Sequence, residues 1–191
     1  MAELMIDYIT SLDGFGSAEG WPGLWGMGGP EYFAFLEDDG AQDCTLLMGA
    51  NTYRLFAEFA RTGAEDMSSL ATREKVVFSN SLSEPLAWTN TTLVPGDAVE
   101  EVRAMKARDA APLRTIGSPG LARSLLKAGL VDRYRVVVFP VVNGATGADR
   151  IYDGWPDVVL EPVSTRTFDG RLQLFEFIPT VLDAPPSRTD S

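Results

Sequence analysis

Histidine is absent from the 191-residue sequence, and cysteine occurs once, as Cys44. The missing imidazole excludes Ser-His-Asp triads, Cys-His pairs and histidine zinc sites, and we predict no metal. A lone cysteine forms no internal disulfide, which suits a reducing cytoplasm. Basic residues are also few, 16 Lys and Arg against 27 Asp and Glu, so the formal net charge is −11. This balance disfavours nucleic-acid binding through a basic surface.

Long apolar segments are missing as well. The longest strongly apolar run, from Val136 to Val142, is too short to span a bilayer, and the first residues carry acids where a signal peptide has a cationic region. The composition, 45% apolar and 23% charged, is typical of a globular protein. We expect one cytoplasmic domain over residues 1–182 with no membrane contact, followed by a disordered tail over 183–191.

Strand and helix patterns alternate along the chain, which predicts an α/β fold. The clearest unit runs from Leu113 to Val142, where Ser118 is a plausible N-cap and Pro119 occupies the first helical position between two strands. The strands of such a βαβ unit run parallel. Only strand patterns follow between Asp157 and Thr180, which predicts an antiparallel pair at one edge. We therefore expect a mostly parallel central sheet, covered by helices on both faces, with antiparallel C-terminal strands.

The strongest candidate for ligand binding is Gly117-Ser118-Pro119-Gly120, between a strand and a helix. The first N–H groups of a helix and its dipole attract a phosphate, and glycines let a ligand approach the backbone closely. A well-capped helix after a tight turn explains the same residues without a ligand.

Two more strand ends carry small polar residues. Gly49, Asn51 and Thr52 lie where a buried strand enters a helix, and Ser79, Asn80 and Ser81 follow the next strand. Asn51 as a helix cap and Ser79–Ser81 as a plain turn are the structural alternatives. Ligands of α/β sheets bind at the carboxyl ends of the strands, so the three segments favour a site when taken together. A glycine-rich stretch over residues 14–29, with two tryptophans, is expected to cover that site or to move.

Together the segments LMIDYITSLDGFG, LLMGANTY, EKVVFSNSL and LRTIGSPGLARSLLKAGLVDRYRVVVFPVVNG resemble the dihydrofolate-reductase-like superfamily. The resemblance is greatest to the reductase domain of bifunctional riboflavin-biosynthesis deaminase-reductases and its stand-alone relatives. It reaches to about Val181, and SLDG together with GS-x-x-L-x-x-x-LL-x-x-GLVD is its most specific part. No zinc-binding deaminase segment is present.

The resemblance implies a three-layer α/β sandwich and hydride transfer from NADPH to a small pterin-like or ribosylaminopyrimidine-like heterocycle. In that picture Gly49, Asn51 and Thr52 face the cofactor phosphates, and Ser79, Asn80 and Ser81 lie along the adenosine ribose. The pyrophosphate is held by Gly117, Ser118, Pro119, Gly120 and Leu121. Proteins of this family commonly form homodimers, so the resemblance implies a homodimer. The strand region from Arg135 to Val141 is the candidate interface.

Departures from the family keep alternatives open. Ala50 stands where the family commonly has an arginine for the extra phosphate of NADPH, so that Arg54 or Arg73 would have to replace it. The loop Asn143 to Gly147 is also altered. A dinucleotide-binding or ligand-sensing protein without turnover is the main alternative, and NADH or a deazaflavin could replace NADPH.

Charge bears on the substrate and on the proton that a reduction needs. Residues 1–53 contain no Lys or Arg, and in the superfamily this part lines the substrate pocket, so a neutral or protonatable ring fits better than a phosphorylated one. Without histidine, the proton donors are carboxyls, Tyr, Lys or water. We predict Asp7, on the first strand, and Glu31, at a helix start, as catalytic residues, because burial of a carboxyl favours its protonated form. A solvent-facing strand position for Asp7 and a favourable first-turn acid for Glu31 are the structural alternatives.

Overall fold

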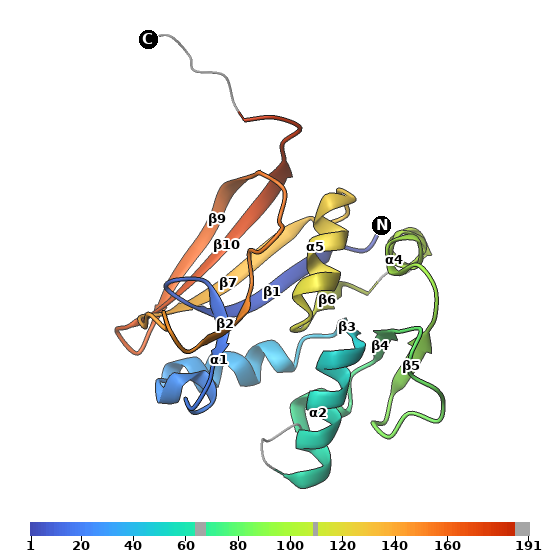
Figure 1. Cartoon of the computed structure of the whole chain (residues 1–191), viewed down its shortest axis with the longest axis horizontal. Helices are drawn as coiled ribbons and strands as arrows, with labels where there is room; N and C mark the ends of the chain where they lie inside the picture. The colour runs from blue at the N-terminus through green and yellow to red at the C-terminus, as the bar shows by residue number, and fades with distance from the viewer. Residues whose placement is uncertain (64–67, 109–110, 186–191) are drawn as a thin grey trace.

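The computed structural model describes residues 1–63, 68–108 and 111–185. Eight strands form the main sheet in the order β5-β4-β3-β6-β1-β7-β10-β9 (Figure 1). Neighbours pair in parallel from β5 to β7, whereas β10 pairs antiparallel with both β7 and β9. The strands are β1 (Leu4–Ser11), β3 (Thr45–Gly49), β4 (Lys75–Phe78), β5 (Thr91–Val94), β6 (Leu113–Thr115), β7 (Arg133–Phe139), β9 (Val158–Phe168) and β10 (Leu172–Val181).

This topology confirms the predicted α/β fold with its antiparallel C-terminal strands. The strands of the predicted βαβ unit, β6 and β7, are parallel, but β1 lies between them and pairs with both. A second, two-stranded sheet of β2 (Phe15–Ala18) and β8 (Gly147–Arg150) was not predicted. The helices are η1 (Gly23–Gly26), α1 (Pro30–Gly40), α2 (Ala50–Thr62), α3 (Ser68–Ala71), α4 (Ala98–Arg108) and α5 (Pro119–Lys127).

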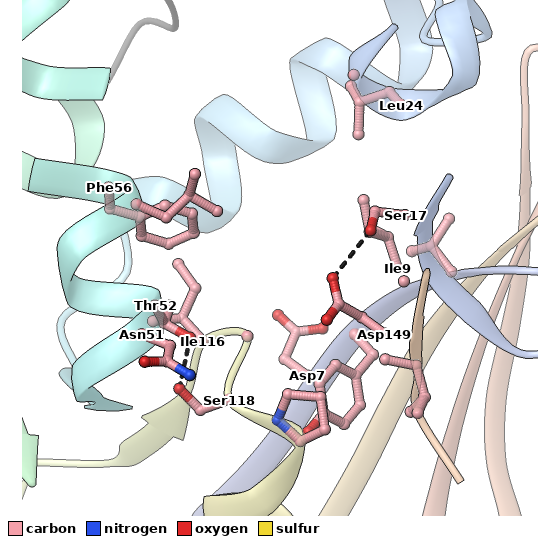
Figure 2. A pocket seen from close by; sticks show the side chains of 18 of the residues that line it. Asp7, Ile9, Ser17, Leu24, Asn51, Thr52, Phe56, Ile116, Ser118 and Asp149 are labelled. Carbon is pink, nitrogen blue, oxygen red and sulfur yellow. Dashed lines mark hydrogen bonds between the residues drawn. The ribbon is translucent and has the colours of Figure 1, made fainter. Parts of the chain in front are cut away.

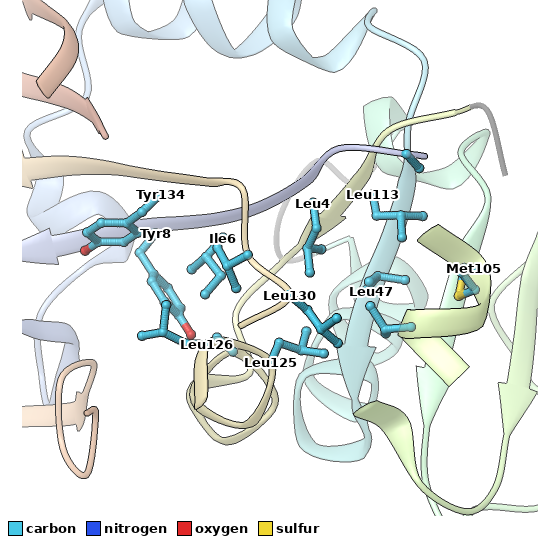
Figure 3. Packing of buried hydrophobic residues seen from close by; sticks show 14 of the residues in the cluster. Leu4, Ile6, Tyr8, Leu47, Met105, Leu113, Leu125, Leu126, Leu130 and Tyr134 are labelled. Carbon is cyan, nitrogen blue, oxygen red and sulfur yellow. The ribbon is translucent and has the colours of Figure 1, made fainter. Parts of the chain in front are cut away.

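The side chains of β1 alternate between the two faces of the sheet. Leu4 and Ile6 are fully buried in a cluster with Met105 of α4 and Leu125 of α5 (Figure 3). Asp7 points to the opposite face, where its partner Arg135 also contacts α1. Because consecutive strand residues face opposite sides, one central strand supplies both a hydrophobic core and a polar site.

Two sequence-based expectations fail in this fold. The apolar residues after Pro30 predict a helix that buries a stripe of Tyr32, Phe33, Phe35 and Leu36. Of these four only Tyr32 is buried, and Phe33 is 52% exposed. The strand considered as a dimer interface, Arg135 to Val141, largely coincides with β7. That strand lies inside the sheet between β1 and β10, so both of its edges are already paired and it cannot extend the sheet into a second chain.

Residues 186–191 of the predicted tail lie outside the described residues. In the parts of the chain that the structure covers, no helix combines the length and the apolarity that crossing a membrane requires.

Candidate functional site

A cavity of about 850 Å³ lies where the carboxyl ends of β1, β3 and β6 meet α1, α2 and α5. It is lined by both of the strand-to-helix corners predicted to bind phosphate, Gly49–Thr52 and Gly117–Leu121, and by Asp7. The stretch between β1 and α1 covers it through Ser17, Leu24 and other residues (Figure 2). This is the position that parallel α/β sheets use for ligands.

Ser118 joins the two corners. Its hydroxyl donates to Thr52 Oγ1 at 2.7 Å and accepts from the Gly49 N–H at 2.8 Å, and Figure 2 shows Ser118 beside Thr52 at one end of the cavity. Ser118 occupies the N-cap position of α5 as predicted, but its side chain does not cap that helix. The hydroxyl instead fixes the start of α2 relative to the start of α5.

The backbone at these corners is shaped for close approach. Gly117 has φ +54°, and a Cβ there would lie 2.9 Å from Thr52 Cγ2, so only glycine fits. A Cβ on Gly120 would meet no protein atom within 4 Å. Neither α2 nor α5 has a side-chain cap at its N-terminus. Two helix N-termini, which attract anions, thus face one open space.

The third predicted segment, Ser79–Ser81, does not line the cavity but is linked to it through Arg54. The Arg54 guanidinium donates to Asn51 Oδ1 and to Ser81 Oγ, both at 3.2 Å. Asn51 lies within α2 rather than capping it. Ser79 Oγ accepts from the N–H groups of Ser81 and Leu82, and Asn80 Oδ1 accepts from the Gly96 N–H, so part of this segment is an ordinary turn.

The other end of the cavity contains a buried ion-pair network. Arg135 of β7 donates from Nε and Nη2 to Asp7 at 3.0 and 2.6 Å, and from Nη1 and Nη2 to Asp39 at 2.7 and 2.9 Å. Arg114 of β6 also pairs with Asp39. The side chains of Arg114, Arg135 and Asp39 are each 9% exposed, whereas that of Asp7 is 24% exposed. Asp7 and Arg135 both line the cavity, and Asp7 is the more exposed of the two.

The opposite charges of this network keep its members ionised. Burial raises the pKa of Asp39, but the hydrogen bonds and charges of Arg135 and Arg114 outweigh it and leave this pKa below its ordinary value. Burial lowers the pKa of the Arg135 guanidinium, yet its bonds to Asp39 and Asp7 raise that pKa above the ordinary value. Arg135 is thus a permanent cation whose donors are already directed at two carboxylates.

Glu31, the second predicted catalytic residue, lies outside the cavity at the start of α1. Its carboxylate accepts from the Asp169 N–H at 2.6 Å. Asp169 in return accepts from the N–H groups of Glu31 and Tyr32 at 3.0 and 3.2 Å. Asp169 thus caps the first turn of α1, and Glu31 holds this capping residue in place through its backbone N–H.

The covering stretch is attached to the loop after β7. Asp13 accepts from the N–H groups of Asn143 and Gly144 at 3.1 and 2.9 Å, and Trp25 Nε1 donates to Asn143 Oδ1 at 2.8 Å. The hydrogen bonds from Gly144 and Ser11 lower the pKa of Asp13 to about 2. Asp13 is a turn residue. The altered loop Asn143 to Gly147 therefore holds the cover in place.

Sequence reasoning missed Arg114, Arg135, Asp39 and Asp149. Asp149 of β8 lines the cavity, accepts from Ser17 Oγ at 2.9 Å, and lies on the same side as Asp7 in Figure 2. An arginine in the middle of the apolar run RYRVVVF was the one available signal, because a buried arginine needs a carboxylate partner. Among the described residues no group of three or more Cys, Asp or Glu side chains is arranged to hold a metal ion.

The sequence matches the family model described as the RibD C-terminal domain over residues 2–174. The uncharacterized protein YyaP of Bacillus subtilis (strain 168) is 25% identical over 173 residues, which cover 86% of this chain and 88% of YyaP.

Two solved structures share the fold. A putative riboflavin biosynthesis protein from Shewanella sp. PV-4 is 20% identical with a TM-score of 0.70, covering 94% of this chain and 99% of that one. A diaminohydroxyphosphoribosylaminopyrimidine deaminase/5-amino-6-(5-phosphoribosylamino)uracil reductase from Thermotoga maritima is 16% identical with a TM-score of 0.64. That match covers 94% of this chain but 57% of the Thermotoga protein.

Proposed function

Because the chain belongs to the RibD C-terminal domain family, we propose that it is a reductase that uses NADPH to reduce a small nitrogen heterocycle. The observation that carries the proposal is the Ser118 hydroxyl, which locks two helix N-termini together at one end of a cavity that has Asp7 at its other end. A dinucleotide needs such a diphosphate site close to a place for the reacting ring.

The corner residues fit a diphosphate. Gly120 leaves open space next to the first turn of α5, and neither helix N-terminus is capped by its own side chains. The N–H groups there would donate to the phosphate oxygens, and Ser118 and Thr52 would keep the two helices at a fixed separation. When bound, the nicotinamide supplies a hydride, so the protein's task is to position the two rings.

Arg54 is our candidate for recognition of the extra phosphate of NADPH. It is exposed and lies between Asn51 and Ser81, where the adenosine end of the cofactor is expected. The other candidate, Arg73, donates to the carbonyl groups of Asp39 and Gln42 near the end of α1 and is occupied there. Arg54 would therefore take over the role of the arginine that Ala50 replaces.

We assign Asp7 to orienting the substrate. With Arg135 donating to both of its oxygens, the carboxylate is fixed as a hydrogen-bond acceptor at the cavity wall. The proton that completes the reduction is then best supplied by water, because Glu31 lies elsewhere. The covering stretch, held by the bond between Trp25 and Asn143, would limit the access of bulk water during the reaction.

Fluorescence titration tests the proposal, because Trp21 and Trp25 line the cavity. We expect saturable quenching by NADPH, with weaker binding of NADH. The variant Gly120→Leu places a side chain into the open space and should abolish quenching while the protein stays folded. The control Lys127→Leu, an exposed position at the end of the same helix, should bind NADPH normally.

Two other outcomes are informative. If neither nucleotide binds saturably but a deazaflavin does, the cavity is a deazaflavin site and the NADPH assignment is wrong. Binding of NADPH without its oxidation by any pterin, folate or aminopyrimidine would favour the alternative of a ligand-sensing protein. Homodimer formation and a cytoplasmic location remain predictions.

A further inference from the structure

We infer that the ring bound at the Asp7 end of the cavity carries hydrogen-bond donors and no phosphate group. This inference rests on the proposed function and narrows its substrate class to unphosphorylated amino- or amidine-bearing heterocycles. It separates this chain from an enzyme that reduces a phosphoribosylaminopyrimidine.

The charged side chains that line the cavity are two acids and one base, namely Asp7, Asp149 and Arg135. Four of the five N–H groups of Arg135 already donate to Asp7 and Asp39, which leaves a ligand one N–H on Nη1 and a cation that two carboxylates already balance. Asp149 accepts from Ser17 and forms no ion pair within the described part of the chain. The substrate end of the cavity therefore offers acceptors and an unbalanced negative charge.

Three other arginines in this part of the fold have contacts of their own. Arg150, next to Asp149, lies over the Phe15 ring at 4.9 Å and 3.8 Å from Asp153. Arg123 donates to the carbonyl of Asp153, and Arg166 lies over the Phe168 ring at 4.6 Å and over the Phe35 ring at 5.8 Å. None of the three lines the cavity. A phosphate monoester, which carries about −1.5 to −2 charges at neutral pH, would meet Arg135 as the one Lys or Arg side chain among the described residues that line the cavity.

The sequence supports the same conclusion independently. Residues 1–53, which contribute β1, the cover and α1, contain no Lys or Arg at all. Every cation at the substrate end must therefore come from later strands, and Arg135 is the one that does. Carboxylates that face a ligand bind amino groups or protonated ring nitrogens with short, charge-assisted hydrogen bonds.

The walls beside these acids suit a flat ring. Ile9, Leu24, Phe35 and Val137 line the cavity together with Asp7 and Asp149. An apolar slot with a few fixed polar groups at one side is the usual form of a site for a small heterocycle. The apolar side chains would contact the ring faces, while the two carboxylates would accept hydrogen bonds from donors at the ring edge.

A matched pair of ligands tests the inference. With the protein saturated with NADP⁺, which cannot reduce the ligand, tryptophan quenching should show that 5-amino-6-ribosylaminouracil binds at least tenfold more tightly than its 5′-phosphate. Equal affinity, or tighter binding of the phosphorylated compound, would overturn the inference while leaving the NADPH titration and the proposed reductase intact. Failure of the NADPH titration is a separate result, which counts against the proposed function.

Asp149→Asn identifies the source of the preference. Asn tolerates the φ of +58° at this position, and the change removes one negative charge from the cavity wall. We expect the preference for the unphosphorylated ligand to fall at least threefold. The control Asp153→Asn makes the same change in net charge at an exposed residue outside the cavity and should leave the ratio unchanged. An equal fall in both variants would show a general charge effect and remove Asp149 from the inference.

Discussion

The Ser118 hydroxyl donates to Thr52 Oγ1 at 2.7 Å, so that residues 66 positions apart hold two helix N-termini at one cavity. Each of the two positions belongs to a separate strand-to-helix corner, β3–α2 and β6–α5. The sequence of either helix alone does not fix the position of its N-terminus relative to that of the other helix. The bond thus converts two ordinary helix starts into one composite site.

Ser118→Ala should weaken NADPH binding by about tenfold, because it frees the two corners and leaves the Gly49 N–H without its acceptor, a loss of about 1–2 kcal/mol. Fluorescence titration with NADPH measures the effect. Ser124→Ala, which removes an exposed hydroxyl from the same helix, is the control and should bind normally. Unchanged affinity in Ser118→Ala would show that the cofactor does not depend on this corner.

Arg54→Ala should lower the preference for NADPH over NADH by about tenfold, since a charge-assisted hydrogen bond to a phosphate contributes about 1.5–3 kcal/mol. The ratio of the two dissociation constants is the quantity to measure. Affinity for NADH should hardly change, because it has no extra phosphate. A parallel loss for both nucleotides would contradict the assignment and point to a general role of Arg54 in aligning α2 with the Ser79–Ser81 turn.

Asp7→Asn should lower kcat/KM by about 10- to 100-fold at unchanged NADPH affinity, because it weakens the acceptor that faces the substrate. Glu31→Gln is the matched comparison, since both acids were predicted catalytic residues. We expect it to retain activity and to lose about 0.5–1 kcal/mol of unfolding free energy through the weaker cap of α1. Steady-state kinetics and urea unfolding distinguish the two roles. Loss of activity in Glu31→Gln with normal stability would restore it as a catalytic candidate.

Asp39→Asn should reduce the free energy of unfolding by about 3 kcal/mol or more. The change removes the carboxylate charge that both buried arginines, Arg114 and Arg135, share, and leaves Arg135 with Asp7. Urea unfolding measures the change. Asp38→Asn, at the neighbouring exposed position of α1, should cost little. A small loss in Asp39→Asn would show that the two arginines reach water or another acceptor.

Stability should fall in acid. Asp13 and Asp39 both have pKa values below the ordinary value of 3.8, to about 2 for Asp13. An acid with a lowered pKa in the folded state stabilises the fold above its ordinary pKa, and this contribution is lost as the pH falls through the folded-state pKa, because the unfolded chain takes up the proton first. The unfolding free energy should therefore decline between about pH 4 and pH 2. Asp13→Asn should show a shallower decline; an unchanged slope would exclude this residue as a contributor.

The alternation of strand and helix signals was sufficient to predict the mostly parallel sheet and its antiparallel edge. These signals are local, since they depend on Pro119 at a helix start or on apolar runs such as YRVVVF. The two corners that line the cavity could also be located in the sequence, because glycine and small polar residues follow the predicted strands there. The exposure of Phe33 could not be predicted, because it depends on which side of α1 faces the sheet.

The residues of the sequence by themselves determined the fold class, the two corners and the lack of cations in the first 53 residues. The tertiary structure alone decided that Arg135, 128 residues from Asp7, neutralises it, that Asp39 and Arg114 complete the network, and that Asp149 joins Asp7 at the cavity. The physical reason is that a charge in a strand is satisfied by partners on neighbouring strands and helices. Those partners are set by the order of strands in the sheet, which no single segment encodes.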